Sequence, residues 1–401
     1  MTDSPDKRLS SAPPTSGILD WLYSQKFRSI ASQVIVLLLL AWGLYEIVLN
    51  TQANLAKLNK QFGFDFLGKA SGFDLSMALI PYSSNSNYGR ALLVGFFNTV
   101  LVAVLGIILA TILGFILGIM RLSKNWVVSR FALGYVELVR NVPLIVQILA
   151  WYTLVLKPLP GVKGAFDLFS SSIFLSNRGL SMPHPTFGNG AWMGLLGIAL
   201  AIALSLFLQR WARLRREQSG QIIPAGLMSL ALIIVLPILA FALAGWPVEW
   251  DYPELAGFNF RGGMTLVPEC IALLIALVIY TASYIAELVR SGIVAVSHGQ
   301  TEAAGALGLN SGKTLRLVVV PQAMRVIIPP LASQYLNLTK NSSLAVVIGY
   351  PDLMYTGGTV NNQAGAAIEV FSIVLIVYLT TSLFTAALMN WFNSRMKLVE
   401  R

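Results

Sequence analysis

Eight long apolar segments constrain the fold of this chain more than any other feature of its sequence. Hydrophobic residues make up 56% of the 401 residues and charged residues only 11%, which is far from the composition of a soluble globular domain. A helix needs about 20 apolar residues to cross the hydrocarbon core of a bilayer, and each segment approaches or exceeds that length. We therefore predict an all-α polytopic membrane protein with about eight transmembrane helices, at residues 29–50, 91–120, 128–157, 191–209, 224–245, 264–290, 326–350 and 364–392.

The distribution of basic residues predicts which loops face the cytoplasm. The net charge is +10, and most of the 28 Lys and Arg residues fall near the two termini and in the loops that share their side. Basic residues accumulate on the cytoplasmic side of membrane proteins, and an even number of spans places both termini together. We expect both termini to be cytoplasmic, so the positive charge requires no nucleic-acid partner. Met1–Phe27 is polar and lacks the apolar core of a cleaved signal peptide.

Few side chains suit metal or redox chemistry. Cys270 is the only cysteine, so neither an internal disulfide nor a thiolate metal site is expected. His184 and His298 fall in loops on opposite sides, which excludes a shared metal or a shared proton transfer. The segment from Gly308 to Thr314 resembles a phosphate loop but is one residue too short, and no buried strand precedes it. We expect no catalytic residue, no metal and no cofactor bound by this chain.

The loop between the sixth and seventh segments carries the strongest functional signal. Thr301–Leu309 is predicted to form a short helix with Glu302 in its first turn and Gly308 at its end, because acidic side chains suit a helix N-terminus and glycine a left-handed end. Small side chains beside Glu302 leave one side of that helix open to another protein. The candidate contact residues are Gly299, Gln300, Glu302, Ala303, Ala304, Gly305 and Gly308.

This loop resembles the cytoplasmic EAA loop of ABC importer permeases, the coupling helix that docks into a cleft of the ATPase subunit. The longer segment, Gly299 to Gly308 followed by Pro321-Gln322-Ala323, is similar to the polar amino-acid uptake branch of that family. This branch includes the histidine, glutamine and general amino-acid permeases. The resemblance covers about residues 88–156 and 266–395. It implies a five-helix core in a bacterial inner membrane.

The segments outside the resemblance suggest additions to that core. The first segment is expected to be an extra N-terminal helix, and the fourth and fifth an inserted hairpin. The expected parts are a cytoplasmic tail at 1–28, the extra helix and a periplasmic loop at 29–87, the first part of the core at 88–157, inserted periplasmic loops and a transmembrane hairpin at 158–263, the second part of the core at 264–395 with its coupling loop at 297–325, and a cytoplasmic tail at 396–401.

The tetrapeptide Glu-Leu-Val-Arg occurs twice, at Glu137–Arg140 and at Glu287–Arg290. A Glu and an Arg three residues apart share a helix face and can pair, which lowers the cost of keeping both near the bilayer. Each copy is therefore either a structural pair or a snorkelling arginine, or else a gate or a substrate contact near the inner mouth of a pathway. Both runs resemble helices of polar amino-acid permeases. Asn141-Val142 stands where that family commonly has Gly-Thr, which indicates the broad-specificity L-amino-acid subgroup.

A polar run in the seventh segment is a candidate for substrate contact. Pro329 and Pro330 are expected to interrupt its helix, and a polar run in lipid must face protein or a water-filled cavity. The Lys340 ammonium suits an α-carboxylate, or it pairs internally with a glutamate of a neighbouring helix. The resembled family has Lys-Asp-Thr-Ser here, so the chain lacks the expected Asp. The pathway candidates are Asn98, Thr99, Gln147, Glu287, Lys340, Asn341, Ser342 and Ser343.

Asn98, Thr99 and Gln147 are single polar positions on apolar helices, and hydrogen bonding between helices explains such residues as often as substrate binding does. The second segment also carries a stripe of small residues at four-residue spacing, which favours close helix packing over a ligand role. The members of the stripe are Gly106, Ala110, Gly114 and Gly118.

The sequence and the resemblance together predict the transmembrane subunit of an ATP-driven importer of polar L-amino acids. The implied partners are ATPase subunits that hold ATP and Mg, a related but non-identical second permease subunit that completes a heterodimer, a periplasmic amino-acid-binding protein, the amino-acid substrate and membrane lipid. The alternative is a secondary transporter or channel driven by an ion gradient, which would use Lys340 and the intramembrane glutamates as ion sites. That alternative leaves the ordered loop at Glu302 without a purpose.

Overall fold

A computed structural model describes residues 25–57, 63–169, 171–221 and 223–396 of the chain. The outer parts of both expected tails, 1–24 and 397–401, lie outside the described residues. The chain divides into two compact units, residues 1–66 and 67–401. The first unit contains the helix α2 (Gln25–Lys57), which includes the first predicted segment and carries apolar side chains on every side. A helix that is apolar all round suits a lipid environment.

The second unit contains the remaining spans, most of them near the predicted positions. Six of its helices are long and apolar enough to cross a membrane, and with α2 the described residues hold seven, or up to eight if one bent pair is a single span. This confirms the predicted polytopic helical fold. The helices of the second unit are α3 (Tyr88–Arg121), α4 (Trp126–Asn141), α5 (Leu144–Ala150), α6 (Trp192–Ser219), α7 (Ala225–Leu243), α8 (Pro268–Val294), α9 (His298–Ala306), α10 (Ser311–Thr314), α11 (Val320–Asn341), α12 (Leu353–Ala364) and α13 (Ala367–Met396).

The third predicted segment is bent rather than straight. Helix α4 and the following helical run at 144–156 meet at an angle of 101°. Pro143 lacks an amide hydrogen and restricts the residue before it, and Val142 is accordingly extended, with φ −99° and ψ 125°. The second run is α5, which continues as a π-helical turn over Trp151–Leu156. The bend separates Arg140 from the apolar half of the segment.

Helices α3 and α8 pack closely along the stripe of small residues. A Cβ atom added at Gly114 would lie 2.6 Å from Ile285 Cβ, and one added at Gly118 would lie 2.7 Å from Val289 Cβ. Ala110 is fully buried, and Gly106 faces Leu338 of α11. The backbones therefore approach as closely as the small residues allow, which confirms the packing role predicted for the stripe.

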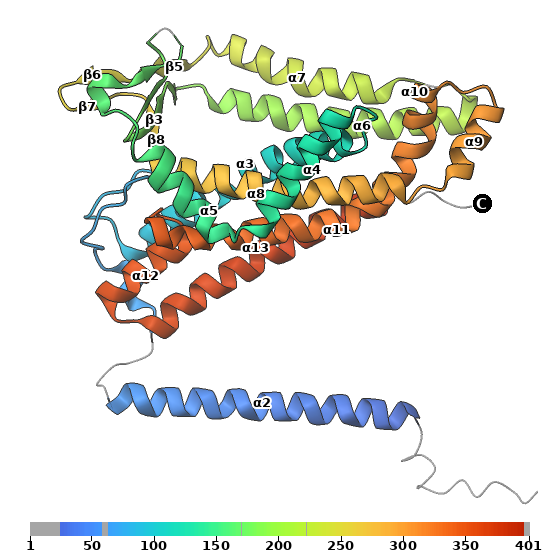
Figure 1. The fold of residues 1–401 in the computed structure, drawn as a ribbon. Coiled ribbons are helices and arrows are strands. Elements are labelled where there is room, and N and C mark those ends of the chain that lie inside the picture. The colour runs from blue at the N-terminus through green and yellow to red at the C-terminus, as the bar shows by residue number, and fades with distance from the viewer. Residues whose placement is uncertain (1–24, 58–62, 170, 222, 397–401) are drawn as a thin grey trace, which may run out of the picture. The chain divides into compact units, whose positions relative to one another are not determined.

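The inserted segment holds a helical hairpin and short strands that the sequence did not predict. Helices α6 and α7 lie side by side (Figure 1), and a Cβ added at Gly197 would lie 2.8 Å from Ala240 Cβ. The strands on either side of this hairpin pair with each other, in the sheet β1-β2-β3-β8 and in the pair β4-β5, while β6 pairs with β7. Their bounds are Phe166–Asp167, Phe174–Ser176, Gly179–Met182, His184–Phe187, Val248–Asp251, Glu254–Ala256, Asn259–Arg261 and Met264–Leu266 for β1 to β8.

Helix α11 runs unbroken through the two prolines that were expected to interrupt it. It covers Val320–Asn341 with Pro329 and Pro330 inside it, so the predicted interruption is wrong. Prolines are tolerated in transmembrane helices because neighbouring groups and local adjustments satisfy the freed carbonyls. The α-helix instead ends at the polar run, where a 3₁₀ segment covers Ser342–Ile348 and closes on Gly349 with φ +78°.

Candidate functional site

The predicted contact loop is an ordered helix with a defined end. Helix α9 starts at His298, one turn earlier than expected, so Glu302 lies in its second turn and the predicted first-turn position is wrong. At the C-terminus Gly308 has φ +76°, its N–H donates to Gly305 O (2.9 Å), and Leu309 N–H donates to Ala304 O (3.1 Å). These two bonds form a Schellman motif, which satisfies carbonyls that the helix leaves free.

The small side chains of α9 divide between an inner and an outer face. Ala304 is 3% exposed and packs inward, whereas Glu302, Ala303 and Gly305 are exposed. A Cβ built at Gly305 meets nothing within 4 Å, and Leu307 is 81% exposed. The outer face of α9 therefore leaves its backbone at Gly305 and the Leu307 side chain open to solvent.

One hydrogen bond fixes α9 relative to a neighbouring helix, and a second contact lies within α9. Gln322 Nε2 of α11 donates to Gln300 Oε1 at 3.1 Å, so the start of α9 is tied to the following long helix. His298 Nδ1 and Glu302 Oε1 lie 3.0 Å apart along α9. Within the second unit, α9 and α10 lie at one end of the long helices and the strands β5–β8 at the other (Figure 1). The contact loop and the inserted strands therefore face opposite sides of a membrane that the long helices cross.

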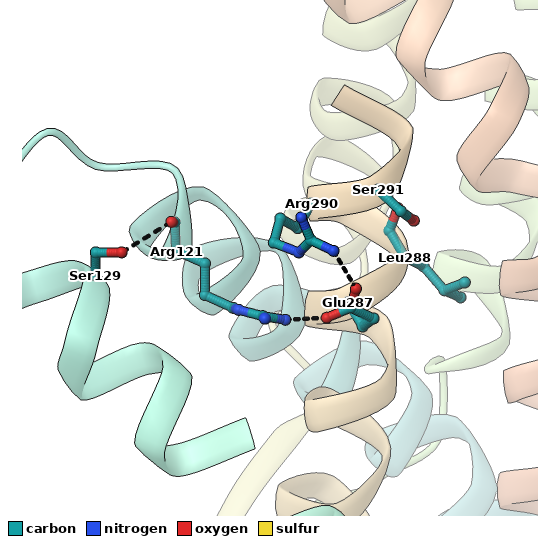
Figure 2. A network of polar contacts seen from close by, with 6 residues as sticks. All are labelled: Arg121, Ser129, Glu287, Leu288, Arg290 and Ser291. Carbon is teal, nitrogen blue, oxygen red and sulfur yellow. Dashed lines mark hydrogen bonds and ion pairs between the residues drawn. The ribbon is translucent and has the colours of Figure 1, made fainter. Parts of the chain in front are cut away.

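The second Glu-Leu-Val-Arg copy forms a three-membered ion-pair network near the same end of α8. Arg290 Nη2 donates to Glu287 Oε1 at 2.6 Å, which is the pairing geometry expected for this copy. Arg121, the last residue of α3, donates to the other carboxylate oxygen of Glu287. Figure 2 shows both arginines converging on Glu287, with Ser129 bonded to the Arg121 carbonyl. The network ties α3 to α8, and its role as a gate stays a prediction.

The first copy is arranged differently. Glu137 and Arg140 are both exposed, and among the described residues no ion pair joins them. The Arg140 guanidinium instead lies 5.0 Å from the centre of the Tyr284 ring, a cation–π geometry, and the Tyr284 hydroxyl is 3.1 Å from the Tyr280 hydroxyl. The repeat in the sequence therefore corresponds to two different contacts.

The polar run at the end of α11 divides into bonded serines and an exposed lysine. Ser342 Oγ donates to Thr339 O (2.8 Å) and Ser343 Oγ donates to Lys340 O (2.7 Å), so these hydroxyl hydrogens satisfy the helix end. Lys340 is exposed, and in the part of the chain that the structure describes no glutamate forms an ion pair with it. Asn341 is half-buried beside it. Lys340 is thus the member of the run whose charge is open to a ligand.

The three isolated polar positions bond to backbone groups. Asn98 Nδ2 donates to Met77 O (2.9 Å) and Pro351 O (2.8 Å). Thr99 Oγ1 accepts from Leu353 N (3.0 Å). The bonds to Pro351 and Leu353 join α3 to the start of α12, which is the helix-to-helix alternative considered for such residues, and the bond to Met77 joins α3 to the segment before it.

Gln147 stabilises the bend at Pro143. Its Nε2 donates to Val139 O and Val142 O, each at 2.9 Å, and so replaces hydrogen bonds that the bend at Pro143 removes. Asn98, Thr99 and Gln147 remain pathway predictions, although their donors are already engaged.

A buried carboxylate at the start of α12 was missed by the sequence reasoning. Asp352 is completely buried, caps α12 by accepting from Tyr355 N (2.8 Å), and accepts from the Tyr378 hydroxyl of α13 (3.3 Å). Burial raises the pKa of this carboxyl to about 6. The pattern Pro351-Asp352 before an apolar residue is a helix-start signal that could have found it.

Comparisons with known proteins identify the family. Residues 228–398 match the family described as binding-protein-dependent transport system inner membrane component. The general L-amino acid transport system permease protein AapQ of Rhizobium johnstonii is 49% identical over 382 residues, which are 95% of each chain. The putative amino-acid ABC transporter permease protein YhdX of Escherichia coli is 45% identical, over 98% of this chain and 97% of its own.

A third relative extends the same pattern. The glutamate/glutamine/aspartate/asparagine transport system permease protein BztB of Rhodobacter capsulatus is 42% identical, over 98% of this chain and all of its own. The fold defines a polytopic helical membrane protein, and these matches place it in the permease class. The chain belongs to the family of binding-protein-dependent transport system inner membrane components, as a relative of amino-acid ABC transporter permeases.

Proposed function

We propose that this chain is the transmembrane subunit of an ATP-driven importer that carries polar L-amino acids across the bacterial inner membrane by alternating access. The observation that carries the proposal is α9, an exposed helix with a Schellman end, at the opposite end of the bundle from the inserted strands. The amino-acid substrates named for the three relatives, which match nearly the whole chain, support the same class of substrate here.

In this mechanism the chain performs no chemistry of its own. A partner ATPase binds and hydrolyses ATP, and its closure moves α9. The motion reaches the bundle along two routes, directly into α8 across residues 295–297 and into α11 through the Gln300–Gln322 hydrogen bond. Nucleotide state then biases the bundle between inward-facing and outward-facing states by linkage, because each ATPase state favours one position of α9.

The remaining partners are implied by the same function. A related, non-identical permease subunit completes the translocation pathway, and a periplasmic amino-acid-binding protein delivers the substrate to the side that carries the strands. Both chain termini and α9 are then cytoplasmic, in agreement with the distribution of basic residues. The exposed Lys340 provides a positive charge for the substrate α-carboxylate.

The decisive experiment separates ATP from an ion gradient as the source of energy. The chain is expressed with its partner subunits, and labelled amino-acid uptake is measured in vesicles with ATP depleted while the ion gradient is held, and in the reverse condition. We expect uptake to depend on ATP and an ATPase subunit to co-purify with the chain. Uptake that depends on the ion gradient, without a co-purifying ATPase, would contradict the proposal and support a secondary transporter instead.

A further inference from the structure

A cavity of about 420 Å³ lies where the ends of two spans meet the start of a third helix. Its walls come from the end of α3, the loop after it, the first turns of α4 and the last turns of α8. We call it the basic pocket, and the lining residues that matter here are Arg121, Ser123, Lys124, Trp126, Arg130 and Arg290.

The basic pocket holds more positive charge than the protein neutralises. Arg121 and Arg290 share the single carboxylate of Glu287, and Arg290 Nε is buried with no partner in the described chain. Lys124 and Arg130 are exposed and form no ion pair among the described residues. Like charges placed together repel one another unless an anion joins them. The pocket is therefore electrostatically suited to an anionic ligand.

The hydrogen-bond donors of the pocket suit phosphate oxygens. Guanidinium groups present paired N–H donors that match phosphate geometry, and a lysine ammonium adds a mobile charge. Ser123 Oγ accepts from Asn125 N at 3.2 Å, which leaves its own hydrogen free to donate. The N-terminus of α4 begins at Trp126, so its dipole adds partial positive charge beside the same cavity.

The position of the basic pocket along the spanning helices favours a lipid over a free anion. It lies at the ends of the spans α3 and α8, which is where we expect lipid headgroups to begin. Trp126, at its rim, is 70% exposed, and Val127 and Phe131 beside it are each 65% exposed. Tryptophan at a membrane surface prefers the headgroup layer, and the neighbouring apolar side chains suit acyl chains. A ligand with a phosphate head and apolar tails matches both halves of this surface.

We propose that the basic pocket binds the headgroup phosphate of an anionic phospholipid. Through the network in Figure 2 the bound phosphate would hold Arg121 of α3 and Arg290 of α8 together, close to the loop that leads into α9. The lipid would thereby stabilise the junction between the spans and the contact helix. Retention of the lipid does not depend on which substrate is carried.

The test measures lipid retention by the purified full-length chain with native mass spectrometry. Phosphatidylglycerol and phosphatidylcholine are titrated in parallel into the unmodified chain, the double variant Lys124→Gln/Arg130→Gln and the matched control Arg213→Gln/Arg216→Gln. The control removes the same charge from α6, outside the pocket. We expect preferential retention of phosphatidylglycerol by the unmodified chain. The affinity should fall about thirtyfold in the pocket variant, because each of its two basic residues contributes a roughly equal share of the attraction to the headgroup. It should be unchanged in the control, whose residues lie outside the pocket.

Four results would overturn the proposal. The unmodified chain could retain both lipids equally, which needs no variant to observe. The control could lose phosphatidylglycerol as strongly as the pocket variant, which would assign retention to general surface charge. Inorganic phosphate could displace the lipid completely, which would make a free anion the ligand. Finally, the isolated chain but not the ATPase-bound complex could retain the lipid, which would make the pocket a protein contact.

Discussion

At Gly308 one backbone dihedral decides how the contact helix ends. Its φ of +76° is costly for any residue with a Cβ, by about 1–2 kcal/mol, and most costly for a β-branched one. Nothing lies within 4 Å of a Cβ built there, so a substitution acts through the backbone and not through a steric clash. A substitution at Gly308 therefore tests the backbone geometry of the loop without changing a side-chain contact.

We expect Gly308→Val to reduce co-purification of the ATPase several-fold while membrane insertion remains normal, because the Schellman end of α9 is lost. Gly308→Asn is the matched control, since asparagine tolerates the left-handed region and should retain most of the assembly. Co-purification is measured by quantitative pull-down from solubilised membranes. Equal recovery of the ATPase with the valine and the asparagine variants would contradict the role assigned to this backbone position.

Lys340 belongs to a different function, and its substitution should separate transport from assembly. Lys340→Met removes an exposed charge that forms no ion pair among the described residues, so the fold loses little. We expect uptake at low substrate concentration to fall at least about tenfold, as for the loss of one charge-assisted contact, with ATPase recovery unchanged. Lys69→Met, on an exposed lysine outside the spans, is the control. Unchanged uptake would leave Lys340 with a structural role.

Asp352 provides a pH dependence whose sign is set by burial. Its pKa is raised from 3.8 to about 6. Between these two pH values the folded chain therefore holds a proton that the unfolded chain has released. Stability from this group is fully present below pH 3.8 and is lost as pH rises through about 6. Asp352→Asn retains an N-cap and removes the charge. We expect the thermal midpoint of the purified variant to fall less than that of the unmodified chain over this window, and parallel curves would contradict the assignment.

At the scale of elements, sequence predicted helices well and their interruptions poorly. The stripe from Gly106 to Gly118 identified the packing face of α3 because small residues in lipid have few other uses. The prolines misled in opposite ways. Pro143 bends its segment, whereas Pro329 and Pro330 do not break α11. A proline only removes one backbone hydrogen bond, and the surrounding tertiary structure decides whether the helix bends.

The strands and the ion-pair network were hidden for a different reason. Each strand has four residues or fewer, so no alternation can be read, although the turn at Gly257 is a recognisable hairpin signal. Arg121 pairs with Glu287 across 166 residues of sequence, a contact that no local pattern encodes. The Glu287–Arg290 contact, by contrast, is predictable from helical spacing alone.

The packing of α3 on α8 yields a prediction at the same scale. Gly114→Ala places a Cβ 2.6 Å from Ile285 Cβ, so the helices must separate, at a cost of about 1–3 kcal/mol. Gly134→Ala is the matched control, because a Cβ built there on α4 meets nothing within 4 Å. We expect a lower thermal midpoint for the first variant and none of that loss for the second. Equal midpoints would contradict the tight α3–α8 interface.

At the scale of the second unit, the inserted hairpin is attached at a single narrow point. Its flanking strands pair as β4 and β5, with Phe187 opposite Val248, and Gly188 N–H donates to Pro247 O at 3.0 Å. Helices α6 and α7 bury their small residues, such as Ala201 and Ser205, mainly against each other. The chain therefore leaves and re-enters the strand region at adjacent residues.

This geometry predicts that the hairpin can be removed as a unit. Replacing residues 189–246 by an Asn-Gly turn closes β4 onto β5 as a two-stranded hairpin and removes two spans, which preserves the orientation of every later helix. We expect the shortened chain to insert and to recover the ATPase at near-normal levels, so that any loss of uptake measures the hairpin's own contribution. A matched excision of 192–219 alone removes one span and should invert the orientation of α8 and of every helix after it. If the two deletions behaved alike, the α6–α7 hairpin would have to be counted among the elements that hold the core together.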